Sequence, residues 1–390
     1  MKNKYSWPIV SNKEISIVNR VLKSNKLNYW SGHKCQEFEN KFSKYFGLKH
    51  AVSLANGSVA LDIAIKCLGL KKNSEIIVTP RSYISSVTSV LNQKLKPVFA
   101  DIDLNSQNIE FEHIEKKINK NTKAILLVHL GGMPSNINKI VSLAKKYKLK
   151  IIEDCSQAHG AKINNKYLGS FGDLAVWSLC NDKILNTLGE GGIIATNNFN
   201  YFKKLWAYKD CGKNYTKLLN RKKQFKFRWV HDYEGTNLRM TEVQAAVGIY
   251  QLTKLKEWVK KRNLNANRIN NVCKKFKSIT IQNVPKGFYH SYYRNYIFLN
   301  FKFIDKKWTR EMILEQLNKI GIECDVGSCP EIYREKYLKT KKLNFPKKLK
   351  NAHFLGRNSI SFKVHPDIYK NNFHIKLKKL NNFFTNITIN

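Results

Sequence analysis

The first residue of chemical interest is Lys183, which follows an apolar run (174–179) and precedes a glycine-rich turn (189–192). A lysine amine held in such a partly desolvated place is nucleophilic and can form a Schiff base with a carbonyl group. The chain contains 69 lysine and arginine residues, so Lys183 taken alone is better explained as a surface lysine in a loop. Its interpretation depends on what else the sequence places near it.

Asp154 ends another apolar run and opens the segment 154–160. A carboxylate beside a pyridine nitrogen keeps that ring protonated, which lets pyridoxal phosphate (PLP) accept electrons. Gln157 could hydrogen-bond the phenolic oxygen of such a ring, and Ser156 is small enough to let the ring lie on a strand end. Alone, Asp154 would be an ordinary capping residue; together with Lys183 it points to a PLP site.

A phosphate-binding site is the third expected feature. Asn56, Gly57 and Ser58 precede a helical period, and the free N–H groups and positive dipole end of a helix start favour an anion. A plain helix cap explains these residues equally well. Ser178 could add a hydroxyl to the same phosphate, and Tyr83 could stack on the ring, although large aromatics mostly serve burial.

The elements that must position these residues alternate between strands and helices. The pattern predicts strands at 75–79, 97–101, 123–129, 150–154, 174–179 and 192–196, and helices near 59–68, 83–92 and 137–147. Such alternation implies an α/β fold with a mainly parallel sheet covered on both faces. Ligands of these sheets bind beyond the carboxyl ends of the strands, so the three polar features should converge there. A long helix from 241 should lead into a second unit, with strands near 290–301 and 321–326 and helices near 307–319 and 372–386.

Composition restricts the setting. The 390 residues carry a formal net charge of +41, but lysines are spread along the chain between apolar residues, which indicates solvated helix faces rather than a nucleic-acid-binding tail. The eight cysteines form no CxxC pair, the first residues lack the apolar core of a signal peptide, and no stretch approaches 18 uncharged apolar residues. We expect a cytoplasmic protein with free thiols, no membrane insertion, no metal and no nucleic-acid partner.

Four segments together resemble the DegT/DnrJ/EryC1/StrS family of PLP-dependent sugar aminotransferases, over about residues 27–365. The segments are 56–61, 153–160, 178–192 and 235–246. The resemblance implies PLP fold type I, like aspartate aminotransferase: a large domain with a mainly parallel seven-stranded sheet and a smaller α+β C-terminal domain. It divides the chain into an N-terminal segment (1–30) packing with the small domain, a PLP-binding domain (31–250) and a C-terminal domain (251–390).

The resemblance also implies roles for single residues. Lys183 matches the Schiff-base lysine, Asp154 the partner of the pyridine nitrogen and Gln157 the partner of the ring hydroxyl. The remaining matched positions are the phosphate ligands Gly57, Ser58 and Ser178, the stacking aromatic Tyr83, Ser156 beneath the ring, and Asn237, which would reach the phosphate from the other subunit. It therefore implies a homodimer with shared sites. The substrates would be glutamate and a nucleotide-diphosphate keto sugar, for an amino sugar of O-antigen or capsule.

Some positions depart from the family pattern. Ser58 stands where threonine is usual, Ser156 where alanine is usual and Ile184 where asparagine often follows the lysine, and Asp182 is a less usual neighbour that could tune the local charge. Three alternatives stay open: a PLP-dependent sugar dehydratase of the same fold, in which histidine would replace the lysine; a basic nucleic-acid-binding protein; and a PLP-binding sensor. Arg81 and Arg239 are candidates for binding the diphosphate, and the segment 327–333 is expected to shape substrate choice.

Overall fold

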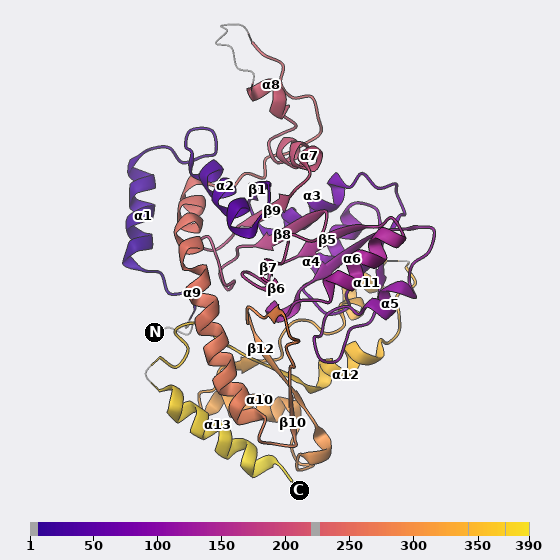
Figure 1. The fold of residues 1–390 in the computed structure, drawn as a ribbon, viewed down its shortest axis with the longest axis vertical. Helices are drawn as coiled ribbons and strands as arrows, with labels where there is room; N and C mark the ends of the chain where they lie inside the picture. The colour runs from indigo at the N-terminus through magenta and orange to yellow at the C-terminus, as the bar shows by residue number, and fades with distance from the viewer. Residues whose placement is uncertain (1–6, 220–226, 342, 371, 390) are drawn as a thin grey trace.

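A computed structural model of the chain describes residues 7–219, 227–341, 343–370 and 372–389. A seven-stranded sheet lies in the upper part of the molecule, called here the large unit, and a smaller sheet lies below it, in the small unit. The long helix α9 runs alongside both (Figure 1). Among the described residues, no helix combines the length and the apolar character needed to cross a bilayer.

The elements of the upper part follow one another in the predicted alternation. Its strands are β1 (His50–Leu54), β2 (Glu75–Val78), β3 (Lys96–Phe99), β4 (Thr122–Val128), β5 (Lys150–Asp154), β6 (Lys162–Ile163), β7 (Lys166–Tyr167), β8 (Leu174–Ser178) and β9 (Gly192–Thr196). Its helices are α1 (Asn12–Lys23), α2 (Lys34–Phe46), α3 (Gly57–Cys67), α4 (Ser85–Asn92), α5 (Phe111–Glu115), α6 (Ile137–Lys146), α7 (Phe199–Lys209) and α8 (Tyr215–Leu219).

The large sheet has the order β1-β9-β8-β5-β4-β2-β3. The pairs β8–β5, β5–β4, β4–β2 and β2–β3 are parallel, whereas β9 runs antiparallel to both of its neighbours, β1 and β8. The prediction of a mainly parallel seven-stranded sheet is confirmed. Side chains alternate between its faces, so one apolar cluster packs against α2, α6 and α9 and another packs against α3, α4 and α7.

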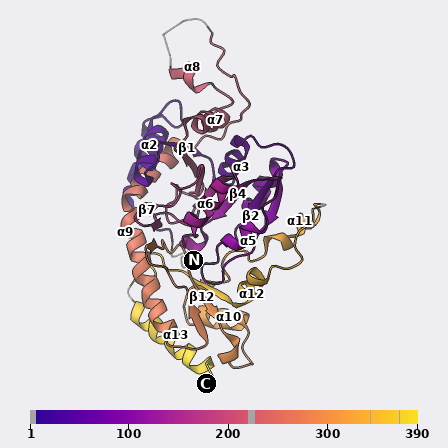
Figure 2. The same ribbon diagram turned by 45° about the vertical axis from the view of Figure 1, so that its right-hand side comes forward.

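The lower part is built on an antiparallel sheet of order β10-β12-β14-β13. This part contains the strands β10 (Ile279–Ile281), β12 (Asn295–Leu299), β13 (Cys324–Asp325) and β14 (Ser359–Phe362), with the helices α10 (Arg310–Lys319), α11 (Lys336–Lys339), α12 (Lys350–Asn358) and α13 (Phe373–Ile387). β11 (Phe288–Tyr289) instead pairs with β6, in a three-stranded sheet of order β11-β6-β7. The apolar core of this part joins the small sheet to α13 and to the second half of α9 (Glu242–Cys273). Figure 2 shows α9 spanning both parts and α13 lying against its lower end.

The predicted boundary between residues 250 and 251 falls inside α9, which is one uninterrupted helix of 32 residues. A capping box starts this helix, since Thr241 and Gln244 bond each other's backbone N–H groups. The division of the chain into three units stays a prediction.

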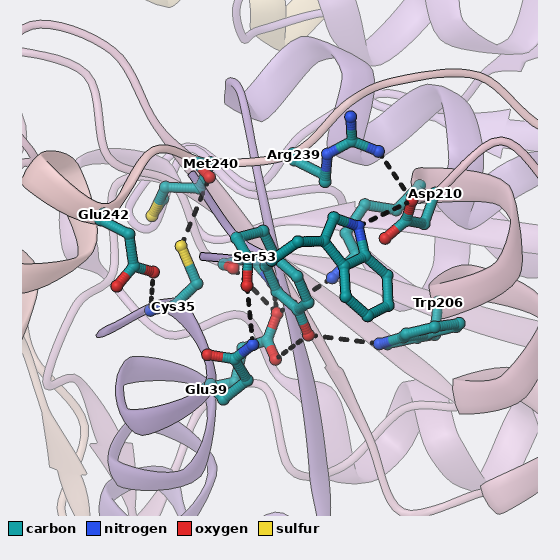
Figure 3. Close-up of polar contacts among 12 residues, drawn as sticks. Cys35, Glu39, Ser53, Trp206, Asp210, Arg239, Met240 and Glu242 are labelled. Carbon is teal, nitrogen blue, oxygen red and sulfur yellow. Dashed lines mark hydrogen bonds and ion pairs between the residues drawn. The ribbon is translucent and has the colours of Figure 1, made fainter. Parts of the chain in front are cut away.

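A buried polar cluster connects α2, β1 and α7 (Figure 3). Glu39 accepts hydrogen bonds from the backbone and hydroxyl of Ser53, both at 2.8 Å, and lies 3.4 Å from the amine of Lys209. Tyr29 donates to the same carboxylate at 3.1 Å and accepts from Trp206 at 3.2 Å. This cluster fixes the end of α7, where the chain leaves the body.

From there an arm (residues 210–219 and 227–239) stands away from the sheet and carries α8 (Figure 1). Its two ends are held together by a bridge between Asp210 and Asn237 and by an ion pair of 2.6 Å between Asp210 and Arg239. The aromatic side chains of Phe227 and Trp229 are 78% and 83% exposed on this arm. Such exposure of large apolar groups is typical of a binding surface.

Candidate active site

A cavity of about 820 Å³ opens at the carboxyl ends of β5 and β8. Eight of the nine predicted site residues line it: Gly57, Ser58, Tyr83, Asp154, Ser156, Gln157, Ser178 and Lys183. They come from four separate segments of the large unit, brought together because parallel strands present their carboxyl ends at one edge. The small unit supplies the remaining wall.

One side of the cavity is the start of α3. Asn56 caps the helix by accepting a hydrogen bond from the backbone of Val59 at 3.0 Å, and the helix begins at Gly57. A β-carbon at Gly57 would lie only 2.6 Å from that of Ser178, so the backbone there passes against β8 as closely as a residue without a side chain allows. Ser58 faces the cavity and its hydroxyl lies 2.7 Å from that of Ser85.

The floor is formed where β5 and β8 end. Ser156 donates its backbone N–H to Asp154 at 3.0 Å, and its hydroxyl accepts from the backbone of Ser178 at 3.0 Å, which joins the two strand ends. Burial raises the pKa of Asp154, although the hydrogen bonds from Ser156 act in the opposite direction. Among the described residues no ion pair to Asp154 is recorded, so this buried carboxyl group is suited to a cationic ligand atom.

Lys183 enters the cavity from the loop after β8. Its amine lies 3.4 Å from the hydroxyl of Tyr293 and 3.4 Å from a carboxylate oxygen of Asp182. Burial lowers the pKa of Lys183, but the phenol of Tyr293 and the carboxylate of Asp182 raise it more, and the net shift is upward. Burial raises the pKa of Asp182, while the Lys183 ammonium and the Tyr293 hydrogen bond lower it to about 2.

Gln157 and Tyr83 both line the cavity and come from different loops. The amide oxygen of Gln157 accepts from the backbone of Gly131 at 2.7 Å, and its amide nitrogen donates to Ser328 at 3.4 Å. Tyr83, between β2 and α4, is 68% exposed rather than buried in the core. Its ring is therefore free to cover a ligand, as the alternative of a core aromatic would not allow.

Asn237 is the predicted residue that the structure does not bring to this cavity. It lies exposed on the arm, where its side chain accepts from the backbone of Arg239 at 3.4 Å. Whether it completes the site of another subunit stays a prediction.

Arg81, one of the candidates for binding the diphosphate, is not among the residues that line the cavity. Its side chain is 1% exposed, donates to Ser359 at 2.7 Å and stacks on Tyr296, so it joins the large unit to the small sheet. Arg239 is engaged with Asp210 at 2.6 Å on the arm. A different arginine, Arg294, lines the cavity and lies 3.3 Å from Asp325.

The sequence analysis missed most of the wall from the small unit. Tyr293, Arg294 and Tyr296 lie just before or within β12, and the segment 325–329 starts at the last residue of β13. The segment 327–333 had been expected to influence substrate choice, and its first three residues do line the cavity. The signal that could have found Tyr293 and Arg294 is a run of aromatic and basic residues at the start of a predicted strand.

One group within the described residues has the spacing of a metal site: His129, Glu153 and Cys155. The carboxylate of Glu153, however, already accepts backbone hydrogen bonds from Gly169, Phe171 and Gly172 at 2.7–2.8 Å and lies 3.2 Å from His129. These contacts satisfy the carboxylate and explain the group as a buried network that fixes the loop between β7 and β8.

The cavity fits the cofactor that the sequence leads us to expect. The start of α3 offers backbone donors to a phosphate, the buried carboxyl group of Asp154 suits a protonated ring nitrogen, and the amine of Lys183 can meet an aldehyde. Gly57 and Ser58, the first residues of this helix, both line the cavity, so an anion there would lie at the helix start.

Comparisons with known proteins agree with this geometry. The DegT/DnrJ/EryC1/StrS aminotransferase family profile matches residues 8–375. The chain is 34% identical over 288 residues to the GDP-perosamine synthase of Escherichia coli O157:H7, covering 73% of this chain and 75% of that protein. An aminotransferase from Psychrobacter cryohalolentis superposes with a TM-score of 0.96 at 37% identity, covering 98% of this chain and 99% of that one.

A more distant structure is that of an E. coli GDP-4-keto-6-deoxy-D-mannose-3-dehydratase with bound hydrated PLP. It has a TM-score of 0.85 and 27% identity, and the match covers 95% of this chain and 97% of that one. The same fold is thus found in an enzyme with a different activity. The protein described here belongs to the DegT/DnrJ/EryC1/StrS family of PLP-dependent sugar-nucleotide aminotransferases.

Proposed function

We propose that the protein transfers an amino group from glutamate to the keto group of a nucleotide-diphosphate sugar, producing an amino sugar for O-antigen or capsule. The observation that carries the proposal is the convergence of the Lys183 amine, the Asp154 carboxyl group and the start of α3 on one cavity. The similarity to the GDP-perosamine synthase supports a sugar nucleotide as the acceptor.

In this proposal each lining residue has a role toward PLP. Lys183 holds the cofactor, Asp154 faces the ring nitrogen and Gln157 the ring hydroxyl, while Tyr83 and Ser156 cover the two ring faces. Gly57, Ser58 and Ser178 receive the phosphate. PLP, when bound, supplies an electron sink for the carbanion that amino transfer requires.

The protein's own groups handle the protons. Lys183, once its amine is free, is the base that removes the proton from the Cα of the amino donor and passes it on in the same half-reaction. In the second half-reaction the same amine gives a proton to the acceptor carbon. The Lys183 side chain is 15% exposed, so most of it is shielded from bulk water by the cavity walls. Arg294 is placed to bind an anionic group of either substrate, such as the donor's carboxylate or the sugar diphosphate.

A second copy of the chain is part of the proposal. The arm exposes Phe227 and Trp229 and carries Asn237, which lies outside the cavity of its own chain. A homodimer in which each arm reaches the partner's cavity would bury the aromatics and supply the phosphate with one more donor. Mixing Lys183→Ala and Asn237→Ala subunits tests this, because a mixed dimer regains one complete site. No recovery from two separately folded, inactive variants would contradict it.

The alternatives carry less support. In the dehydratases of this fold the resemblance implies histidine at the position of Lys183, which argues against that activity here. Among the described residues, a second cavity, of about 750 Å³, is lined by four lysines, but two of these are paired, Lys66 with Glu234 at 2.9 Å and Lys217 with Asp232 at 2.8 Å. All eight cysteines are free thiols, which supports a reducing compartment, the cytoplasm.

The deciding experiment is an absorbance spectrum of the protein with PLP, then with glutamate. We expect a visible band of lysine-bound PLP that glutamate bleaches and that Lys183→Ala lacks. Lys145→Ala, an exposed lysine on α6, is the control and should keep the band. Adding a keto sugar nucleotide to the bleached enzyme should restore the band and give an aminated product. A product without nitrogen would favour dehydration, and no Lys183-dependent band would overturn the proposal.

A further inference from the structure

The amine of Lys183 is held by two residues that come from different parts of the fold. Asp182 precedes it in the loop after β8, whereas Tyr293 is 110 residues further along the chain, just before β12. The amine lies 3.4 Å from each of their oxygen atoms and 4.8 Å from the centre of the Tyr293 ring. Tyr293 itself is 8% exposed, so its position is fixed by packing.

The hydrogen-bond directions make this pair specific for an ammonium group. Tyr293 donates its hydroxyl proton to Asp182, so its oxygen turns a lone pair toward the amine of Lys183 and accepts from it. Asp182 contributes a negative charge, and the ring contributes its electron-rich face. All three features favour the protonated amine over the neutral one.

The backbone around the pair is fixed by one buried arginine of α9. Arg262 donates to the carbonyl groups of Tyr292 and Tyr293, both at 3.3 Å, and stacks on Trp7 at 5.1 Å. Trp7 in turn donates to the carbonyl of Lys183 at 3.1 Å. Arg262 and Trp7 together therefore position the backbone of Lys183 relative to that of Tyr293.

We propose that Asp182 and Tyr293 are positioning residues that form a holding site for the free amine of Lys183, keeping it protonated at the cavity wall whenever it is not bonded to the cofactor. The inference rests on the proposed function and deepens it. In the holding site Lys183 is a proton donor; to act as a base it has to leave the pair, so the pair separates the two proton-transfer roles of one side chain.

The other groups that face Lys183 do not explain the same effect. They are Asp154 and His159 from the end of β5 and the loop after it, and Cys180 from its own loop. Burial lowers the pKa of His159 to about 3, so its imidazole is neutral, and burial raises the pKa of Asp154. Asp182, with its lowered pKa, is the carboxylate that stays charged beside the amine.

The test measures the amine without cofactor or substrate. The full chain, freed of PLP, is labelled with acetic anhydride at a series of pH values, and mass spectrometry follows Lys183 alone. Only the neutral amine reacts, so the midpoint of labelling reports its protonation. The variants are Asp182→Asn and Tyr293→Phe. Glu257→Gln is the control, because Glu257 lies on α9 and forms an exposed ion pair with Lys261.

Removing a negative charge from beside an ammonium lowers the pKa of that ammonium. We expect the midpoint to fall by about one pH unit or more in Asp182→Asn, by less in Tyr293→Phe, and not at all in Glu257→Gln. Unchanged midpoints in both cavity variants would overturn the inference. Tyr293→Phe keeps the ring packing, so it tests the idea even if Asp182→Asn folds poorly.

This outcome is independent of the proposed function. A lowered midpoint together with a missing PLP band in the wild type would keep the holding site and reject the aminotransferase. A normal PLP band and amino transfer, together with unchanged labelling midpoints in the variants, would keep the aminotransferase and reject the holding site.

Discussion

Two lysine sites in this protein are built from the same three groups. Lys183 lies 3.4 Å from the carboxylate of Asp182, and Lys209 lies 3.4 Å from that of Glu39. In each site a tyrosine hydroxyl donates to the same carboxylate, and the amine lies over the tyrosine ring, at 4.8 Å from Tyr293 and at 3.5 Å from Tyr29.

The surroundings separate the two sites. The side chains of Lys183 and Asp182 are 15% and 49% exposed and border the large cavity, whereas Lys209 is fully buried and Glu39 is 9% exposed. Burial lowers the pKa of Lys209, and Glu39 and Asp210 offset only part of that shift, while the net shift of Lys183 is upward. The same three groups thus fix the end of α7 at Lys209, whereas at Lys183 they hold an amine that borders the cavity. The two sites differ in their access to the cavity, not in their residue types.

Substitution of the two lysines is expected to give the largest difference between the sites. Lys183→Ala should reduce amino transfer by about 10⁴-fold or more, because it removes both the cofactor attachment and the base. Its free energy of unfolding should stay near that of the wild type, since Asp182 is half exposed and can be hydrated. Single-turnover kinetics with glutamate and urea unfolding measure the two effects. Substantial residual transfer would mean that another group serves as the base.

Lys209→Met should have the opposite profile. It leaves the Glu39 carboxylate buried without its cation, which costs about 3–5 kcal/mol of stability. The protein that remains folded should still form the visible PLP band. Denaturant unfolding gives the loss, and Lys209→Met combined with Glu39→Gln should recover part of it. If the single variant lost less than about 1 kcal/mol, water would have to reach Glu39, and the contrast between the sites would weaken.

The two tyrosines give a smaller contrast. Tyr29→Phe removes the bond to Glu39 and leaves the indole N–H of Trp206 without its acceptor, which should cost about 1–3 kcal/mol. Tyr293→Phe should cost less, because water can replace the hydroxyl at the half-exposed Asp182. Thermal or urea unfolding of the matched pair measures the difference, and equal losses would contradict the role given to solvent.

The smallest effect is a pH dependence at Asp182. Its pKa is about 2 in the folded protein and 3.8 without the fold, so its stabilising contribution is present above pH 4 and disappears as the pH falls toward 2. Because the group is half exposed, screening should keep this contribution below about 1 kcal/mol. The difference in unfolding free energy between wild type and Asp182→Asn should therefore shrink between pH 5 and pH 2. A difference that grows as the pH falls would contradict the prediction that the fold lowers the pKa of Asp182.

The part of the cavity made by the large unit could be predicted from the sequence. Asp154 and Ser178 end apolar runs, and parallel strands place such ends side by side. The alternation of strands and helices therefore predicts that these two residues lie close together. The direction of β9 did not follow, because the apolar run 192–196 reads the same in a parallel and an antiparallel strand.

The wall from the small unit was beyond such reasoning. Tyr293 reaches Lys183 only because Arg262, Trp7 and the small sheet set its place, and no local pattern encodes contacts across 110 residues. Arg81, one of the candidates for the diphosphate, is a related case. Its side chain is buried between the large unit and the small sheet, where it donates to Ser359 and lies over the ring of Tyr296.

The long helix α9 has a mechanical consequence. Its 32 residues form one continuous rod that is packed against the large sheet at one end and the small sheet at the other. A rod of this kind resists bending unless a proline or a bulge interrupts it, and its sequence has no proline. We therefore expect no hinge in the middle of α9. We expect the loops at the rim, such as 326–329, to adapt to substrates of different size more than the spacing of the two sheets does.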